Sequence, residues 1–182
     1  MYFDRITSDG RLWSVVYEGK ETNALDELFE QWSNPVWLRS FFEVNMSDLI
    51  SYFKVTDVNT AIYDTMDDNE QLQCLILDIS PEADLEALFR PLENNRMHEI
   101  VLGREKAKIR NRPCHASWLR LYAIKLDSGI YIVTGGAIKL TATMAERQHT
   151  IDELGKLEQV RNLLLSEGIV DADGFNDFVQ QQ

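Results

Sequence analysis

Three runs with strand character follow one another along Arg104–Lys139, and this stretch constrains the fold more than any other. In the first run, Arg104–Arg110, a basic residue occupies every second position, so a strand would place all four cations on one face. The second run is Ser117–Leu126 and the third is Ile130–Thr134. The short connection between them, Asp127–Gly129, contains a glycine that can supply the positive φ of a tight turn. The stretch therefore predicts a three-stranded antiparallel meander.

Helical patterns lie on both sides of this meander. Before it, a strand at Arg11–Glu18 is followed by apolar residues at helical spacing from Leu25 to Trp32, and similar patterns continue to residue 80. Within that region, periodicity does not distinguish a strand from a buried helix at Leu72–Ile79. After the meander, Thr150 and Glu153 have the spacing of a capping box at the start of a helix.

These patterns predict an α+β fold. We expect a small antiparallel sheet, made of the three-stranded meander and an N-terminal strand, packed against helices, with a long helical insertion between residues 35 and 80. The 182 residues are expected to form a single domain, residues 1–182, because no long low-complexity linker interrupts them. Within it, residues 1–90 form an acidic, mostly helical part with the first strand. Residues 91–182 form the basic meander and the C-terminal helices.

The charge of the chain is unevenly distributed. The formal net charge is −12, yet residues 90–161 hold 13 Lys or Arg against 8 Asp or Glu. Residues 1–89 hold 5 Lys or Arg against 18 Asp or Glu. Such asymmetry indicates either an anion-binding segment or acidic helices that cover and neutralise the basic strands.

Several classes of protein lack support in the sequence. No apolar run approaches the roughly 18 residues of a transmembrane helix, and the N-terminus has no signal-peptide pattern, so we expect a cytoplasmic protein without a membrane partner. Cys74 and Cys114 lack metal or redox spacing. Nucleotide-loop and zinc-protease motifs are absent, and the three histidines are not spaced as metal ligands, so no metal or cofactor is expected. Gly135–Gly136 indicates a tight turn or a close approach of the backbone rather than a phosphate loop.

The cations of the meander are the strongest functional signal. Arginine offers phosphate a bidentate fork and lysine offers it a point charge. In RNA, the 2′-hydroxyl is a built-in nucleophile, so cleavage needs a base, cations that stabilise the transition state and an acid for the leaving 5′-oxygen. The candidate catalytic residues are Arg120, Lys139, His149 and Tyr122. The candidate RNA- or phosphate-binding residues are Lys106, Lys108, Arg110 and Lys125.

The order of these motifs resembles that of the RelE/HigB-like toxin superfamily of bacterial type II toxin–antitoxin systems. The resemblance covers residues 85–165 and rests on Arg120-Leu121-Tyr122, the hairpin into Tyr131-Ile132-Val133, the segment Gly136–Thr141, and a following helix with Glu153 and Arg161. It implies an α+β fold, ribosome-dependent cleavage of mRNA and neutralisation by a small antitoxin protein. It places Arg120 at a phosphate-engaging strand arginine and Lys139 at the lysine that closes the last strand. Two adjacent lysines are usual there in the family, whereas this chain has Ile138-Lys139-Leu140.

Three hypotheses follow from the sequence. The first is a toxin-type, metal-independent mRNA endonuclease whose partners are RNA or the ribosome and an antitoxin. The second is a non-catalytic protein-interaction module on the same fold. The third is an unrelated α+β domain whose cations are structural. The sequence does not specify an oligomeric state.

Overall fold

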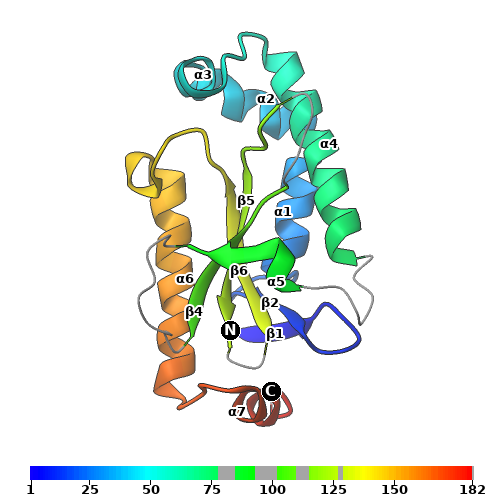
Figure 1. Cartoon of the computed structure of the whole chain (residues 1–182), viewed down its shortest axis with the longest axis vertical. Coiled ribbons are helices and arrows are strands. Elements are labelled where there is room, and N and C mark those ends of the chain that lie inside the picture. Colours follow the sequence, from blue (N-terminus) through cyan, green and yellow to red (C-terminus); the bar gives the residue numbers. More distant parts are fainter. Residues whose placement is uncertain (78–84, 93–101, 110–114, 127–128, 182) are drawn as a thin grey trace.

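A six-stranded mixed sheet runs through the middle of the molecule, in the order β1-β2-β6-β5-β4-β3 (Figure 1). The computed structural model describes residues 1–77, 85–92, 102–109, 115–126 and 129–181. The strands are β1 (Tyr2–Arg5), β2 (Leu12–Val16), β3 (Phe89–Pro91), β4 (Gly103–Ala107), β5 (Leu119–Lys125) and β6 (Tyr131–Ile138). Among these described strands, β2 and β6 pair in parallel, and the other neighbours pair antiparallel.

Helices cover both faces of the sheet. They are α1 (Ala24–Trp32), α2 (Pro35–Val44), α3 (Met46–Asp48), the π-helix η1 (Leu49–Phe53), α4 (Val58–Leu77), α5 (Leu85–Leu88), the 3-10 helix η2 (Met144–Glu146), α6 (Gln148–Ser166) and α7 (Ala172–Val179). Local chemistry sets several starts. The side chain of Asn23 accepts hydrogen bonds from the N–H groups of Leu25 and Asp26, and Asn34 caps α2 in the same way, directly before Pro35. Within the part of the chain that the structure describes, no helix is both long and apolar enough to cross a membrane.

The two faces of the sheet bury two separate clusters of apolar side chains. One cluster joins the sheet to α1, α2 and α4, with Trp32, Phe42 and Trp118 at its centre. The other joins the opposite face to α6 and α7 through Leu157, Val160 and Phe175, among others. In Figure 1, α6 accordingly lies on one side of the strands, and α1 and α4 lie on the other.

The predicted α+β class and the antiparallel β4-β5-β6 meander are confirmed, and the sheet is larger than predicted. Strands β1 and β3 were not predicted, and the parallel β2–β6 pair makes the sheet mixed rather than antiparallel. The third predicted strand extends through Gly135–Gly136 to Ile138. The ambiguous segment is helical from Leu72 to Leu77, where it completes α4, and its last two residues lie outside the described ranges.

The predicted capping box at Thr150 and Glu153 is wrong. Helix α6 begins at Gln148, and the hydroxyl of Thr150 donates to carbonyl oxygens at Met144 and Arg147. The capping box forms instead seven residues earlier in the chain, between Thr143 and Glu146, at the start of η2. Glu153 is thereby left buried within α6, facing the sheet.

Candidate anion-binding site

The cations of β4 lie on one side of the sheet, as the period-two pattern predicts. Along this strand, Arg104 and Lys106 are half-buried and alternate with buried neighbours, and Ala107 and Ile109 enter the core shared with α1, α2 and α4. Lys106 pairs in register with Tyr122 on β5. The fourth cation of the run, Arg110, lies outside the described residues. The polar face of β4 therefore adjoins the face of β5 that carries Arg120 and Tyr122.

These side chains line a cavity of about 590 Å³. We name it the cationic pocket, and its lining comprises Leu92, Arg104, Lys106, Lys108, Arg120, Tyr122, Lys139, Ala142, Thr143, Met144, Ala145 and Leu154. Five of these twelve residues are Lys or Arg, and none of the described lining residues is acidic or a histidine. The pocket thus gathers cations in a chain whose overall charge is strongly negative.

Main-chain carbonyl groups hold most of these cations in place. The guanidinium of Arg120 donates to the carbonyl oxygens of Ser117 at 2.8 Å and Leu119 at 2.7 Å. The ammonium of Lys139 donates to those of Thr141 at 2.6 Å and Ala142 at 2.7 Å. Neither Arg120 nor Lys139 forms an ion pair with a carboxylate among the described residues. A carbonyl orients a cation without cancelling its charge, so both remain suited to an incoming anion.

Arg104 and Lys106 have further partners at the edge of the pocket. Nη1 of Arg104 lies 2.6 Å from Oε1 of Glu158 on α6, an ion pair that is partly exposed to solvent. Nζ of Lys106 donates to the carbonyl oxygen of Leu92 at 2.9 Å. The pair with Glu158 offsets the charge of Arg104 at the side of the pocket next to α6.

Burial and mutual repulsion change the acidity of the pocket. Burial lowers the pKa of Arg120, and burial together with the charge of Arg120 lowers the pKa of Lys106. The pKa of Lys139 is lowered by burial first and then by Arg120. Burial raises the pKa of Tyr122, whose hydroxyl has no hydrogen-bond partner among the described residues. A bound anion would relieve the repulsion between the cations and give this hydroxyl an acceptor.

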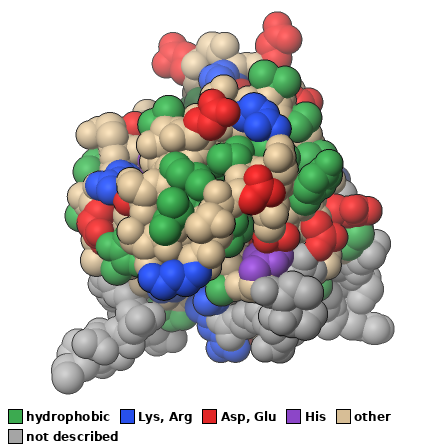
Figure 2. Space-filling view, turned by 90° about the horizontal axis from the view of Figure 1, so that it is seen from above, with side chains coloured by type: hydrophobic (Ala, Val, Ile, Leu, Met, Phe, Trp, Pro, Cys, Tyr) green, Lys and Arg blue, Asp and Glu red, His purple; other side chains and the backbone are tan. Residues whose placement is uncertain are grey.

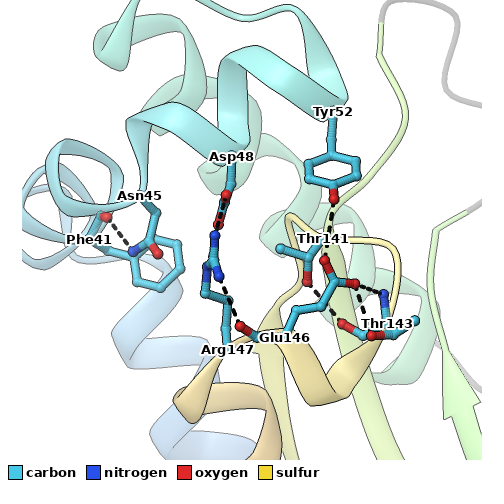
Figure 3. A network of polar contacts seen from close by, with 8 residues as sticks. All are labelled: Phe41, Asn45, Asp48, Tyr52, Thr141, Thr143, Glu146 and Arg147. Carbon is cyan, nitrogen blue, oxygen red and sulfur yellow. Dashed lines mark hydrogen bonds and ion pairs between the residues drawn. The ribbon is translucent and has the colours of Figure 1, made fainter.

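Figure 3 shows polar contacts between the helical insertion and the segment that follows β6. Asp48 of α3, whose side chain is 8% exposed, binds Arg147 through two hydrogen bonds of 2.6 and 2.7 Å. The hydroxyl of Tyr52 lies 3.3 Å from the carboxylate of Glu146, which in turn caps the backbone of Thr143. These contacts anchor the segment after β6 that supplies Lys139 and residues 142–145 to the pocket.

Two predicted site residues lie away from the cationic pocket. Lys125 is on the opposite face of β5, where its ammonium lies 2.6 Å from Glu86 and over the ring of Tyr131. His149 faces a different pocket, packs edge-on against Phe41, and places Nε2 3.0 Å from the carbonyl oxygen of Ile138. The structure therefore brings Lys106, Lys108, Arg120, Tyr122 and Lys139 together and separates them from Lys125 and His149.

On the face of the molecule at α2, α3 and α4, charges of both signs are interspersed. Figure 2 views the molecule from the end formed by α2, α3 and α4, where basic, acidic and apolar side chains alternate over the described surface. No group of three or more His, Cys, Asp or Glu side chains among the described residues is arranged to hold a metal ion.

Comparison of the chain with family models, with curated proteins and with solved structures yields no match. The case for a function therefore depends on the geometry and chemistry of the pockets.

Proposed function

We propose that the cationic pocket binds the phosphodiester backbone of RNA and that the protein is a RelE/HigB-like, toxin-type mRNA endonuclease acting without a metal in the bacterial cytoplasm. The observation that carries this proposal is the convergence of Arg104, Lys106, Lys108, Arg120 and Lys139 on one cavity. Arg120 and Lys139 keep their positive charge without a carboxylate partner among the described residues. A concave surface of this kind suits a phosphate group.

Cleavage would use the neighbouring 2′-hydroxyl of the RNA as the nucleophile. Lys106, whose pKa is lowered, serves in its neutral form as the base that takes the 2′-hydroxyl proton. The 2′-oxygen attacks phosphorus and the bond from phosphorus to the 5′-oxygen breaks, which leaves a 2′,3′-cyclic phosphate. Arg120 stabilises the charge on the phosphoryl oxygens, and the ammonium of Lys139 gives its proton to the leaving 5′-oxygen. The protonated hydroxyl of Tyr122 donates a hydrogen bond to a phosphoryl oxygen.

Induction in a bacterial host tests this activity. We expect arrested growth and new RNA 5′ ends, and we expect both effects to disappear in Arg120→Ala while Lys125→Ala, on the other face of β5, retains them. With purified protein and ribosomes, cleavage should stop when the mRNA carries a 2′-deoxy sugar at the cleaved position. Normal growth with unchanged RNA ends would contradict the proposal.

A non-catalytic binding module is the second candidate, and one observation favours it. The described lining of the cationic pocket contains no histidine and no carboxylate, and burial raises the pKa of Tyr122, so proton abstraction would depend on a lysine. Under this alternative, RNA or an acidic segment of a protein partner occupies the pocket and no bond is cleaved. Fluorescence titration with RNA at two salt concentrations, followed by analysis of the RNA, separates the candidates. Salt-sensitive binding that leaves the RNA intact supports the module.

A further inference from the structure

A second pocket lies at the other side of β6, where the sheet has an open edge. Strand β2 pairs with β6 only as far as Val133. Within the described residues, the rest of β6, from Thr134 to Ile138, has no strand neighbour on that side. An uncovered edge presents main-chain N–H and C=O groups that need partners.

Side chains take the place of the missing strand. The hydroxyl of Tyr17 donates to the carbonyl oxygen of Thr134 at 2.6 Å, and Nε2 of His149 lies 3.0 Å from that of Ile138. Between them, the carboxylate of Glu153 lies directly against the backbone at Gly135, where a Cβ atom would be only 2.0 Å from Oε2. The absence of a side chain at Gly135 therefore allows the close approach of α6 to β6.

Glu153 is a buried carboxylate at this open edge of the sheet. Its side chain is only 9% exposed, and Oε1 accepts a hydrogen bond of 2.6 Å from Nζ of Lys156. Burial raises the pKa of the carboxyl, whereas Lys156 and the N–H of Gly136 favour its charged form. The other oxygen, Oε2, is buried against the backbone at Gly135. A carboxylate with so little access to water favours a strong donor at Oε1, the oxygen that the partly exposed Lys156 contacts.

The rest of the pocket is aromatic and acidic. It has a volume of about 230 Å³, and we name it the Glu153 pocket. Four aromatic side chains contribute to its lining, namely Tyr17, Trp32, Trp37 and Phe41, and Glu27 supplies a second carboxylate. Trp37, Glu27 and Gln31 also border an adjoining depression of about 360 Å³ that includes Glu30. Aromatic faces and carboxylates both attract cations.

The resident Lys156 shows that this environment accommodates a positive group. Its ammonium binds Glu153 and lies 5.9 Å from the centroid of the Tyr17 ring. Lys156 is itself partly exposed, so a guanidinium from outside can take its place at Oε1 and lie against the aromatic wall of α1 and α2.

We propose that the Glu153 pocket binds the guanidinium group of an arginine side chain from a protein partner. The planar fork of a guanidinium matches a carboxylate, and its faces stack on aromatic rings such as Trp37. The adjoining depression with Glu27 and Glu30 would contact the residues that flank this arginine. The inference does not depend on RNA binding in the cationic pocket.

Titration of the ¹⁵N-labelled protein with N-acetyl-arginine amide tests the proposal. We expect saturable shifts of the Gly136 amide and of the Trp37 indole N–H, and none with N-acetyl-citrulline amide, which has a similar shape but no charge. Equal shifts with citrulline, or an unmoved Gly136 amide, would overturn the inference. Spermidine forms a parallel arm, and tighter binding of spermidine than of arginine would overturn the assignment to a protein side chain in favour of a free polyamine.

Variants locate the binding to the carboxylate. Glu153→Gln should weaken arginine binding at least about tenfold, because a charge-assisted pair becomes a neutral hydrogen bond. Asp152→Asn removes one negative charge from the adjacent exposed position on α6 and should leave the affinity unchanged. If Glu153→Gln fails to fold, Trp37→Leu replaces it, with an expected loss of about fivefold. Wild-type affinity in the folded variant would exclude this pocket.

Discussion

The cationic pocket and the Glu153 pocket are close neighbours with opposite chemistry. Helix α6 contributes to both, since Leu154 lines the first and Glu153 the second. In the first, buried cations are oriented mainly by main-chain carbonyls. In the second, a buried carboxylate is oriented by a lysine and by the backbone of β6. The difference shows how an acidic chain can hold an anion site, because β6 and α6 keep the two kinds of charge apart.

The largest effect should come from breaking the wall that separates the pockets. A Cβ atom at Gly136 would lie 2.6 Å from the carbonyl oxygen of Arg120 and 2.9 Å from Cδ1 of Leu28. Backbone cannot move aside cheaply, so Gly136→Ala should lower the free energy of unfolding by about 3 kcal/mol. Gly135→Ala meets only the end of the Glu153 side chain and should cost about 1 kcal/mol. Denaturant unfolding measures both, and equal costs would contradict this account.

The next largest effect separates the two faces of β5. Arg120→Ala should weaken binding of single-stranded RNA by about 10- to 100-fold, the usual range for a hydrogen bond to a charged group. Lys125→Ala removes the same charge from the face paired with Glu86 and should change the affinity less than about twofold. Fluorescence anisotropy at low salt gives both values, with thermal melting as the control for folding. Similar losses in the two variants would mean that charge alone, and not the pocket, governs binding.

The sequence predicts this contrast only in part, for physical reasons. Alternation along a single strand is local, so the shared face of Arg104, Lys106 and Lys108 follows from period two alone. His149 is ten residues from Lys139 in the chain, yet the two side chains enter different pockets. Their separation depends on how α6 packs across β6, which no local pattern encodes.

The position of Glu153 against β6 was not predicted, because the Thr-x-x-Glu spacing of a capping box occurs twice in this part of the chain. Thr143 and Glu146 have the same spacing as Thr150 and Glu153, and tertiary packing decides which pair caps a helix. Gly135–Gly136 was the sequence feature that could have indicated this position, because it predicted either a tight turn or a close approach of the backbone. The approach is confirmed, with the carboxylate of Glu153 against Gly135 and the backbone of Arg120 against Gly136.

The pH dependence of cleavage tests the role of Lys106 in the cationic pocket. The pKa of Lys106 lies below its usual 10.5, so its base form appears at a lower pH than for an exposed lysine. If Lys106 is the base and Lys139 the acid, kcat/KM should rise with pH as Lys106 loses its proton and fall again as Lys139 loses its own. Lys106→Arg keeps the charge but cannot deprotonate, so it should abolish the rise. A wild-type rate that is flat between about pH 7 and 9 would exclude a lysine base.

In the Glu153 pocket we expect a smaller effect, which is a change of the free energy of unfolding with pH. Burial raises the pKa of Glu153 above 4.5, so the folded state binds this proton more tightly than the unfolded state does. The resulting stabilisation is present below pH 4.5 and is lost as the pH rises through the pKa of the folded state. Relative to the wild type, Glu153→Gln should therefore become more stable as the pH rises over this interval. Chemical denaturation across the pH series checks this, and a constant difference would contradict the raised pKa.

The smallest effect should come from the helical insertion, which acts on the cationic pocket only through its wall. Asp48→Asn replaces the ion pair with Arg147 by a weaker hydrogen bond, so the segment that carries Lys139 is held less firmly. RNA affinity should therefore fall about threefold. Arg147→Ala should have the same effect, and the double variant should add little, because both changes break one contact. Tyr52→Phe, which loses only a 3.3 Å hydrogen bond to Glu146, serves as the matched control with a smaller change. Additive losses would show that Asp48 and Arg147 act separately, and an unchanged affinity in the Asp48 variant would show that β5 and β6 alone position the cations.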